Sequence, residues 1–351
     1  MKQNPHIVFL TPGFAVSEAD STTIPAQQIF LKALQKSIPN AKLTIIAFHY
    51  PFQKKQYKWF GFDVIPLNGK NNKLKKIITW YKVIQTLKNL NKEQKITTIH
   101  SFWIGECAFI GNYFSKKNKT PHVTTAMGQD VNTENLLPKL INFKNRKIVS
   151  QSKIQQEILL RNHHINSTII PWNLDIDSFP EIKESTIDIL GVGSLNEVKN
   201  YSLFIDIVSD LVQIKPNLKI EIIGDGQQFE FLKNKIETRK LAKNISLLGL
   251  LSRNEVLLKM SQTTLLLHTS TFEGFGYVFA EALYSGMKII SFNVGTSMPS
   301  SKWKIANSKE EMIQFCNEYL NQKKSFKQRF LLNSENETVS SYLKLYNEKN
   351  Y

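Results

Sequence analysis

Short apolar runs alternate with helical patterns along most of this chain of 351 residues. An apolar run of about four to eight residues between turn residues is typical of a buried parallel strand. Apolar residues at helical spacing predict helices that cover the sheet. The alternation therefore predicts an α/β protein with a parallel, doubly wound sheet.

The alternation falls into two series. The first predicts strands at 6–10, 43–47, 96–99, 122–125, 147–149 and 168–170, and helices near 25–37, 74–90, 105–116 and 152–162. The second predicts strands at 188–192, 219–223, 245–247, 264–268 and 288–292, and helices near 200–214, 227–240, 253–261, 278–285 and 309–322. The segment 171–184 between them has two prolines, several acidic residues and no periodicity, so we expect a linker.

The bulk properties fit two domains of ordinary size, because 351 residues exceed one typical core. Cys107 and Cys316 are the only cysteines and stand in no metal or redox spacing, which indicates a reduced compartment. The run 7–10 is of strand length and ends at Pro12, so no N-terminal signal is expected, and no apolar stretch is long enough to span a bilayer. We expect a cytoplasmic protein.

The net charge is +16, which favours anionic partners. Lysines and aromatic residues gather in one stretch of the first series: Lys70, Lys73, Lys75, Lys76, Trp80, Tyr81 and Lys82. Such a mixture suits the anionic inner face of the cytoplasmic membrane, and a solvated helix face explains it equally well. No nucleic-acid-binding motif accompanies the charge, so nucleic acid is not an expected partner.

Two glutamates, Glu273 and Glu281, follow the predicted strand 264–268 in the segment Thr-Phe-Glu-Gly-Phe-Gly-Tyr-Val-Phe-Ala-Glu-Ala-Leu. Gly274 and Gly276 precede a predicted helix, and the free N–H groups of a first helical turn bind phosphate. Carboxylates repel phosphate but accept hydrogen bonds from hydroxyl groups. A ligand with both groups, a nucleotide sugar, fits this segment, and a surface loop followed by a solvated helix glutamate is the alternative.

The segment resembles the donor-site signature of retaining glycosyltransferases of the GT-B fold, family 4 (glycosyl transferases group 1). The resemblance implies that Glu273 and the N–H groups after it hold the sugar and phosphates, and that Glu281 holds the ribose hydroxyls. It also implies two Rossmann-like, doubly wound domains that face a central cleft. Residues 1–170 would then bind the acceptor and residues 185–325 the nucleotide sugar. Residues 326–351 would include a helix that crosses back to the first domain.

A second glycine loop, Gly-Val-Gly-Ser-Leu-Asn-Glu-Val-Lys at 191–199, follows the first strand of the second series. Glycine lets the backbone approach a ligand, and Lys199 suits a diphosphate whose charge grows as it leaves. The family has a similar loop, usually with an arginine where this chain has Ser194. The Gly-Asp-Gly turn at 224–226 is expected to shape the cleft, and the loop 248–251 resembles the one that meets the nucleotide base. His268 is expected to be a packed histidine.

The first domain offers weaker candidates. Gly13 follows the first strand, and its polar loop is either an acceptor site or a simple connection. Residues 126–131 resemble the family's His-Gly-x-Asp, with Gly128 and Asp130 matched and Met127 in place of the histidine. Asp130 could orient an acceptor hydroxyl or cap a helix. His100 is either a substitute for the missing histidine or a structural residue.

The resemblance, taken with these patterns, implies a metal-independent hexosyltransferase without a cofactor. Its donor would be a nucleoside diphosphate sugar, UDP or GDP, and its acceptor a glycan or lipid-linked hydroxyl in bacterial surface polysaccharide, lipopolysaccharide or capsule synthesis. The alternatives are a non-catalytic nucleotide-sugar-binding partner of a glycan assembly complex and a sugar-nucleotide epimerase on the same fold. The candidate catalytic residues are Lys199, Glu273, Asp130 and His100. The candidate donor-binding residues are Gly13, Gly193, Ser194, Lys199, Gly249, Glu273, Gly274, Phe275, Gly276, Tyr277, Val278 and Glu281.

Overall fold

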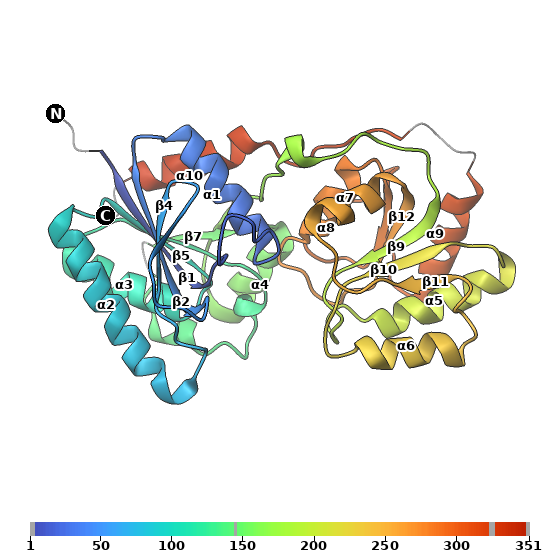
Figure 1. The fold of residues 1–351 in the computed structure, drawn as a ribbon, viewed down its shortest axis with the longest axis horizontal. Coiled ribbons are helices and arrows are strands. Elements are labelled where there is room, and N and C mark those ends of the chain that lie inside the picture. Colours follow the sequence, from blue (N-terminus) through green and yellow to red (C-terminus); the bar gives the residue numbers. More distant parts are fainter. Residues whose placement is uncertain (1–3, 144–145, 323–326, 349–351) are drawn as a thin grey trace. The chain divides into compact units, whose positions relative to one another are not determined.

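The computed structural model describes residues 4–143, 146–322 and 327–348. The chain divides into two compact units (Figure 1). Unit 1 comprises residues 1–173 and 333–351, and unit 2 comprises residues 174–332. Each unit contains one sheet whose strands are mostly parallel. The predicted α/β class with two doubly wound sheets is therefore confirmed.

Unit 1 is built on an eight-stranded sheet in the order β3-β4-β2-β1-β5-β6-β7-β8. All neighbouring strands are parallel except the antiparallel pair β3–β4. The central strand β1 has six consecutive buried residues, because both faces of a parallel sheet are covered. The strands are β1 (His6–Gly13), β2 (Lys42–Tyr50), β3 (Tyr57–Trp59), β4 (Phe62–Pro66), β5 (Thr98–Phe102), β6 (His122–Thr125), β7 (Lys147–Ser150) and β8 (Thr168–Ile169).

The β3–β4 hairpin was not predicted from the sequence. Its turn residues Phe60 and Gly61 both have positive φ, at 40° and 85°, as a two-residue hairpin turn of type I′ requires. Trp59 and Phe62 flank the turn and are fully buried. β3 has only three residues, β4 is interrupted by Asp63, and Phe60 is an unusual residue for this backbone conformation, so neither signal stood out in the sequence.

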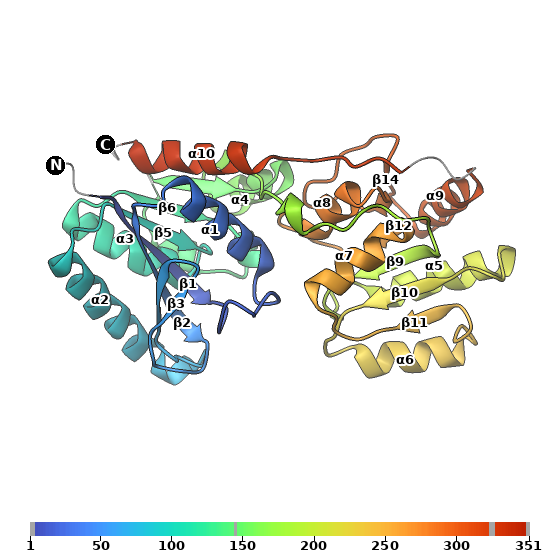
Figure 2. The same ribbon diagram turned by 45° about the horizontal axis from the view of Figure 1, so that its top comes forward.

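Five α-helices cover the described part of this sheet: α1 (Pro25–Ser37), α2 (Lys76–Glu93), α3 (Glu106–Asn118), α4 (Lys153–His163) and α10 (Glu335–Asn347). The C-terminal helix α10 lies along α1 in unit 1 (Figure 2). It begins with a capping box between Ser334 and Glu337. Residues 326 and 349–351, which fall within the predicted C-terminal stretch, lie outside the described residues.

Unit 2 is built on a six-stranded parallel sheet in the order β11-β10-β9-β12-β13-β14. Its strands are β9 (Ile187–Val192), β10 (Ile220–Ile223), β11 (Ile245–Leu247), β12 (Thr263–His268), β13 (Lys288–Ser291) and β14 (Trp303–Ile305). Its helices are α5 (Tyr201–Ile214), α6 (Phe229–Thr238), α7 (Arg253–Ser261), α8 (Tyr277–Tyr284) and α9 (Lys309–Asn321). The edge strand β14 is short and was not predicted.

The order of the strands in unit 2 creates a topological switch point. From β9 the chain continues to β10 and β11 on one side of the sheet, and then returns to β12 on the other side of β9. The loops that follow β9 and β12 therefore leave the sheet from neighbouring carboxyl ends. Open α/β sheets bind ligands at such a point. Both loops carry the glycine motifs found in the sequence.

Within the described residues, no helix is long and apolar enough to cross a membrane.

Helix α10 contributes two buried tyrosines to the core of unit 1. The Tyr342 ring packs against Phe30 at 4.6 Å and against His100 at 5.2 Å between ring centroids. Its hydroxyl forms a hydrogen bond with the Thr125 hydroxyl at 2.9 Å. The helix thus closes the core over the middle of the sheet.

We expect Tyr342→Ala to lower the free energy of local opening of unit 1 by about 3–5 kcal/mol, because it leaves a cavity. Tyr342→Phe should lower it by about 1 kcal/mol, the usual net value of one hydrogen bond. Hydrogen-exchange mass spectrometry of peptides from β6 and α10 measures the effect. Peptides of unit 2 and the exposed-site variant Lys344→Ala serve as controls. Unchanged exchange in Tyr342→Ala would show that α10 does not stabilise this core.

Candidate functional site

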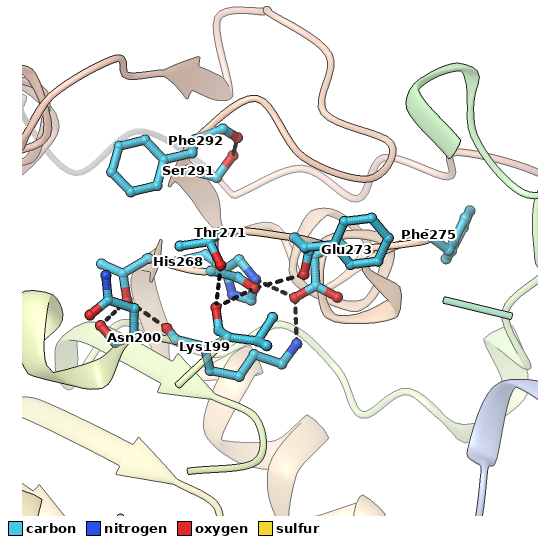
Figure 3. A network of polar contacts seen from close by, with 12 residues as sticks. Lys199, Asn200, His268, Thr271, Glu273, Phe275, Ser291 and Phe292 are labelled. Carbon is cyan, nitrogen blue, oxygen red and sulfur yellow. Dashed lines mark hydrogen bonds and ion pairs between the residues drawn. The ribbon is translucent and has the colours of Figure 1, made fainter. Parts of the chain in front are cut away.

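The candidate site of unit 2 centres on contact between Lys199 and Glu273 (Figure 3). Lys199 lies in the loop that follows β9, and Glu273 lies in the loop that follows β12. The Lys199 Nζ atom forms an ion pair with Glu273 Oε1, and the side chains are 20% and 12% exposed. The two residues that the sequence singled out from separate motifs therefore touch at the switch point.

Side-chain hydroxyls hold the two loops together. Thr269 Oγ1 donates to the carbonyl oxygens of Lys199 at 3.0 Å and Asn200 at 2.9 Å. Ser270 Oγ donates to the carbonyl oxygen of Val198 at 3.1 Å, and the Thr271 N–H donates to the same oxygen at 2.9 Å. Backbone carbonyls of one loop thus find their donors on the other, which fixes the position of Lys199 relative to Glu273.

The Gly-Asp-Gly turn after β10 packs directly under the loop that follows β9. A Cβ atom on Gly224 would lie 1.9 Å from the carbonyl oxygen of Gly193, and one on Gly226 would lie 2.5 Å from that of Leu195. The Leu195 N–H donates to the Asp225 carbonyl oxygen at 2.9 Å. Only glycine permits this close approach, so the turn supports the backbone of the loop that follows β9.

Glu273 is ionised because of its neighbours. Burial raises the pKa of its carboxyl group, but the hydrogen bond from His268 and the charge of Lys199 outweigh this and lower the pKa to about 2. His268 Nε2 lies 2.8 Å from Glu273 Oε1, and a carboxylate only accepts, so this nitrogen carries a hydrogen. Burial lowers the pKa of His268, which keeps the imidazole neutral. The histidine orients the carboxylate, in addition to being packed as expected.

The N-terminus of α8 follows directly after Glu273. Its N-cap, Gly276, has φ 77° and provides no side chain to accept from the first helical N–H groups. A Cβ atom on Gly276 would lie 2.4 Å from the Phe279 ring, so both the backbone conformation and the packing require glycine. The Phe275 carbonyl oxygen accepts from Thr296 N and Thr296 Oγ1, both at 2.9 Å. The predicted phosphate-binding helix start is thus uncapped by a side chain and firmly placed.

Glu281, the second glutamate of the motif, forms an ion pair with Arg253 at the start of α7. Burial raises the pKa of Glu281, and the charge of Arg253 opposes that rise. Burial lowers the pKa of Arg253, but Glu281 more than offsets this and raises it. The guanidinium also lies 5.6 Å from the centre of the Tyr277 ring. Sequence reasoning missed Arg253, because a single arginine at a helix start carries no motif.

The remaining candidates of unit 2 lie in or beside these loops. Ser194 is exposed and lies next to Gly193, whose φ is 152°. Gly249 has φ 70°, its carbonyl oxygen accepts from the Gly224 N–H at 2.9 Å, and a Cβ atom on it would meet nothing within 4 Å. Leu250 beside it is 70% exposed. The loop after β11 therefore presents open backbone and an apolar side chain at the carboxyl edge of the sheet.

The candidates of unit 1 include two residues with structural roles. His100 is fully buried, with Nδ1 at 2.7 Å from the Tyr346 hydroxyl and Nε2 at 2.8 Å from the Thr125 hydroxyl. This geometry gives His100 no access to a ligand, so the idea that it replaces the histidine missing at Met127 finds no support. Of the two roles left open for His100, this geometry favours the structural one, because a histidine in a strand can be satisfied inside the core.

Asp130 organises the carboxyl edge of unit 1. Its carboxylate accepts from the backbone N–H groups of Ile104 at 2.7 Å, Gly128 at 2.7 Å and Met127 at 3.0 Å. Burial raises the pKa of Asp130, against these hydrogen bonds. Since both oxygens already accept, the carboxylate holds the loops after β5 and β6 together. Gly13 ends β1 at the same edge, opposite Tyr50.

A carboxylate that the sequence analysis missed, Glu106, lies at the start of α3 in unit 1. It accepts from His49 Nε2 at 2.7 Å and from Trp80 Nε1 at 2.6 Å, and Lys76 Nζ lies 3.9 Å away. Burial raises the pKa of Glu106, but these partners outweigh it and lower the pKa. No short motif joins the four residues, because they come from three separate elements.

A cavity of about 1180 Å³ lies elsewhere in unit 2, where β9, β12 and β13 begin. Its lining includes Asp188, Thr264 and Lys288, and none of the candidate site residues. Parallel sheets bind ligands at the carboxyl ends of their strands, so we place the site at the switch point instead. The described residues contain no group of three or more His, Cys, Asp or Glu side chains that could hold a metal ion.

We expect acid to destabilise unit 2 through Glu273. The folded pKa lies below the ordinary value, so the stabilisation is fully present above about pH 4.5 and is lost as the pH falls through about 2. The complete loss should be on the order of 3 kcal/mol. Buried His268 acts in the same direction, because its lowered pKa makes the unfolded chain bind the proton first.

Urea unfolding of unit 2 at about pH 5 and about pH 3 tests this expectation. Glu273→Gln should reduce the difference between the two unfolding free energies. Glu237→Gln, at an exposed carboxylate of α6 in the same unit, should leave the difference nearly unchanged. An equal acid dependence in Glu273→Gln and the unmodified chain would contradict the assignment.

Known proteins share this fold and part of this sequence. Residues 175–300 match the family model described as Glycosyl transferases group 1. An uncharacterized glycosyltransferase from Methanocaldococcus jannaschii is 23% identical over 76% of this chain and 75% of its own length. The alpha-monoglucosyldiacylglycerol synthase of Acholeplasma laidlawii is 27% identical, over 41% of this chain and 40% of its own length. Other curated relatives that we compared are also matched over less than half of their length.

Solved structures extend the likeness to both units. HepE from Anabaena, solved in complex with UDP and glucose, has a TM-score of 0.70 and 16% identity, over 96% of this chain and 99% of its own. Sucrose-phosphate synthase from Thermosynechococcus elongatus has a TM-score of 0.72 and 13% identity, over 98% and 96%. The chain therefore has the GT-B glycosyltransferase fold, and its residues 175–300 carry the sequence pattern of the glycosyl transferases group 1 family.

Proposed function

We propose that the protein transfers a sugar from a nucleoside diphosphate sugar to a hydroxyl group of a glycan or lipid-linked acceptor, with retention of configuration at the anomeric carbon. The observation that carries the proposal is the Lys199–Glu273 pair at the switch point, beside the uncapped start of α8. A cation and a row of N–H groups suit a diphosphate, and an oriented carboxylate suits sugar hydroxyls.

The pairing of each carboxylate with a cation makes phosphate binding compatible with two nearby glutamates. Glu273 forms an ion pair with Lys199, and Glu281 forms an ion pair with Arg253. In our proposal, the diphosphate replaces Glu273 as the partner of Lys199. The Glu273 carboxylate then accepts hydrogen bonds from the sugar hydroxyls, while His268 still orients it. Glu281 accepts from the ribose hydroxyls, and the charge of Arg253 opposes the rise in the Glu281 pKa that burial causes. The ligand thus replaces interactions that the free site already makes.

The proposed reaction needs no general base from the protein. The bond between the anomeric carbon and the diphosphate oxygen breaks, and the acceptor oxygen forms its bond to the same face of that carbon. The acceptor proton passes to the departing phosphate. Lys199 and the first N–H groups of α8 stabilise the negative charge that grows on the diphosphate. The mechanism uses no metal ion and no cofactor, and it tolerates Met127 in place of a histidine.

We propose UDP as the first donor nucleotide to test, with GDP as the alternative. HepE is described in complex with UDP and glucose, which supports this choice. The name of the diacylglycerol-glucosylating relative supports a lipid-linked acceptor. We place the reaction in the cytoplasm, at the inner face of the membrane, in the assembly of a bacterial surface polysaccharide such as lipopolysaccharide or capsule.

We expect Glu281→Ala to weaken UDP binding by about 1–3 kcal/mol, the usual cost of a lost hydrogen bond to a charged group. Isothermal titration calorimetry with UDP measures this, and titration with GDP names the base. The matched control is Glu221→Ala, which removes a partly buried glutamate paired with Lys259 in the same unit. Unchanged UDP affinity in Glu281→Ala would remove the ribose assignment.

We expect Lys199→Ala to lower turnover by more than it lowers donor affinity, because leaving-group charge grows in the transition state. Release of UDP from UDP-glucose and related donors, with and without an acceptor, measures turnover. Lys235→Ala is the matched control, since Lys235 forms a comparably buried pair with Asp206 away from the loops. UDP binding without any hydrolysis or transfer in the unmodified chain would favour a non-catalytic binding partner instead.

A further inference from the structure

Helix α2 and the turn before it hold large apolar side chains in solvent. Leu74 is 92% exposed, Ile77 is 77%, Ile78 is 54% and Tyr81 is 63% exposed. Their spacing is i, i+3, i+4 and i+7, which places them on one face of the helix. We call these four residues the apolar stripe. A contiguous exposed stripe of this kind marks an interaction surface.

The opposite face of α2 is fixed to the rest of unit 1, so the apolar stripe cannot turn inward. Thr79, Val83, Leu87 and Leu90 are buried in the core. Trp80 packs against Phe109 with 5.2 Å between ring centroids, and its Nε1 donates to the buried carboxylate of Glu106. These contacts define the rotation of the helix about its axis. The stripe is therefore a stable feature of the folded surface.

Lysines surround the apolar stripe, and acidic residues are absent from its part of the sequence. Residues 64–92 contain seven lysines and no Asp or Glu. Lys70, Lys75 and Lys82 are exposed. Glu106 is the acidic group that faces this helix from α3, and Lys76, His49 and Trp80 already occupy it. The surface is both apolar and strongly positive.

We propose that the apolar stripe and its lysines dock on the surface of an anionic lipid bilayer. An uncharged protein partner would explain the stripe but would leave the lysines unmatched. An anionic bilayer matches both, because apolar side chains enter the boundary of the acyl region while lysines reach the phosphates of the headgroups. The partner is the lipid surface itself, and the docking does not depend on sugar transfer.

The apolar stripe begins near the carboxyl edge of the sheet of unit 1. The turn before α2 is tied to the carboxyl end of β2, where the Gly69 N–H donates to the Phe48 carbonyl oxygen at 2.9 Å and the Lys70 N–H donates to that of His49 at 3.2 Å. The start of α2 therefore lies at the edge of the sheet where parallel strands present their ligand-binding loops. Docking would bring this edge of unit 1 to the lipid, which suits a lipid-linked acceptor if the proposed function holds.

Co-sedimentation of the full chain with vesicles tests the proposal. We expect strong binding to vesicles of phosphatidylcholine mixed with phosphatidylglycerol, weak binding to phosphatidylcholine alone, and weaker binding as salt is raised. The double variants Leu74→Ser/Ile77→Ser and Lys75→Glu/Lys82→Glu should each lower the partition coefficient at least about tenfold, as expected for the loss of two surface lysines or of two inserted apolar groups. Their exposed positions should leave the fold unchanged.

Matched controls come from unit 2. Ile214→Ser/Phe231→Ser removes two apolar side chains that are 62% and 55% exposed, and Lys233→Glu/Lys243→Glu reverses two exposed lysines. Both should bind the mixed vesicles as the unmodified chain does. Equal losses in the α2 variants and the controls would reduce the effect to net charge or general hydrophobicity, and would overturn the proposal.

Two further readouts separate the explanations. Sedimentation velocity without lipid shows whether the α2 variants abolish a dimer; a dimer lost together with absent vesicle binding would make the stripe a contact between copies and overturn the proposal. UDP titration of the same variants should match the unmodified chain. Absent vesicle binding with intact UDP binding would reject the docking alone, whereas intact docking without UDP binding would reject only the proposed function.

Discussion

The hydrogen bonds between the loops after β9 and β12 are the constraint on which the rest of unit 2 depends. The hydroxyls of Thr269 and Ser270 satisfy backbone carbonyls of residues 198–200, so two loops that are far apart in sequence behave as one. The strand order places both loops at neighbouring carboxyl ends, and Gly224 lets a third loop pack underneath them. Lys199 and Glu273 meet because the backbone around them is fixed, and their ion pair is a consequence of this arrangement.

The ion pair between Lys199 and Glu273 does not by itself indicate that these residues stabilise the fold. Two largely buried charges lose much of their hydration, and their attraction often no more than compensates for this loss. Replacing a buried ion pair by apolar residues of similar size is often neutral for stability. Charged groups with strongly shifted pKa values at a switch point are instead typical of functional sites. The hydrogen bond from buried His268, which orients the Glu273 carboxylate, supports the interpretation of the pair as part of a functional site. The second pair, Glu281 with Arg253, repeats the arrangement on the neighbouring helices.

The sequence predicted the elements that depend on local pattern. Every predicted strand and helix within the described residues has a counterpart, because apolar runs and helical spacing are local signals. The β3–β4 hairpin and β14 were missed, since β3 and β14 have only three residues each, and β4 is interrupted by Asp63 and ends at a proline. Arg253 was missed for another reason: its importance comes from the packing of α7 against α8, which no local pattern encodes.

The roles of two histidines likewise depend on tertiary contacts and not on local sequence pattern. His100 and His268 both lie on strands at positions that the topology brings near a carboxyl edge, and the sequence favoured a packed His268 while it left both roles open for His100. The structure separates them by their partners: neutral hydroxyls of Thr125 and Tyr346 for His100, and an ionised carboxylate for His268. A histidine between hydroxyls in a closed core has its hydrogen bonds satisfied by neighbours of the fold. One that donates to a partly exposed carboxylate fixes the orientation of that carboxylate.

The two units differ in how strongly their surfaces are determined by the fold. In unit 2 the glycines, the uncapped helix start and the ion pairs all converge on one edge of the sheet, so several residues would have to change together to alter it. In unit 1 structural contacts hold the equivalent edge in place, with Asp130 and Glu106 each binding backbone or side chains of neighbouring elements. What remains free to vary there is the outer face of α2, whose inner face is locked by Trp80. A helix anchored on one side can change its exposed residues without disturbing the sheet beneath it.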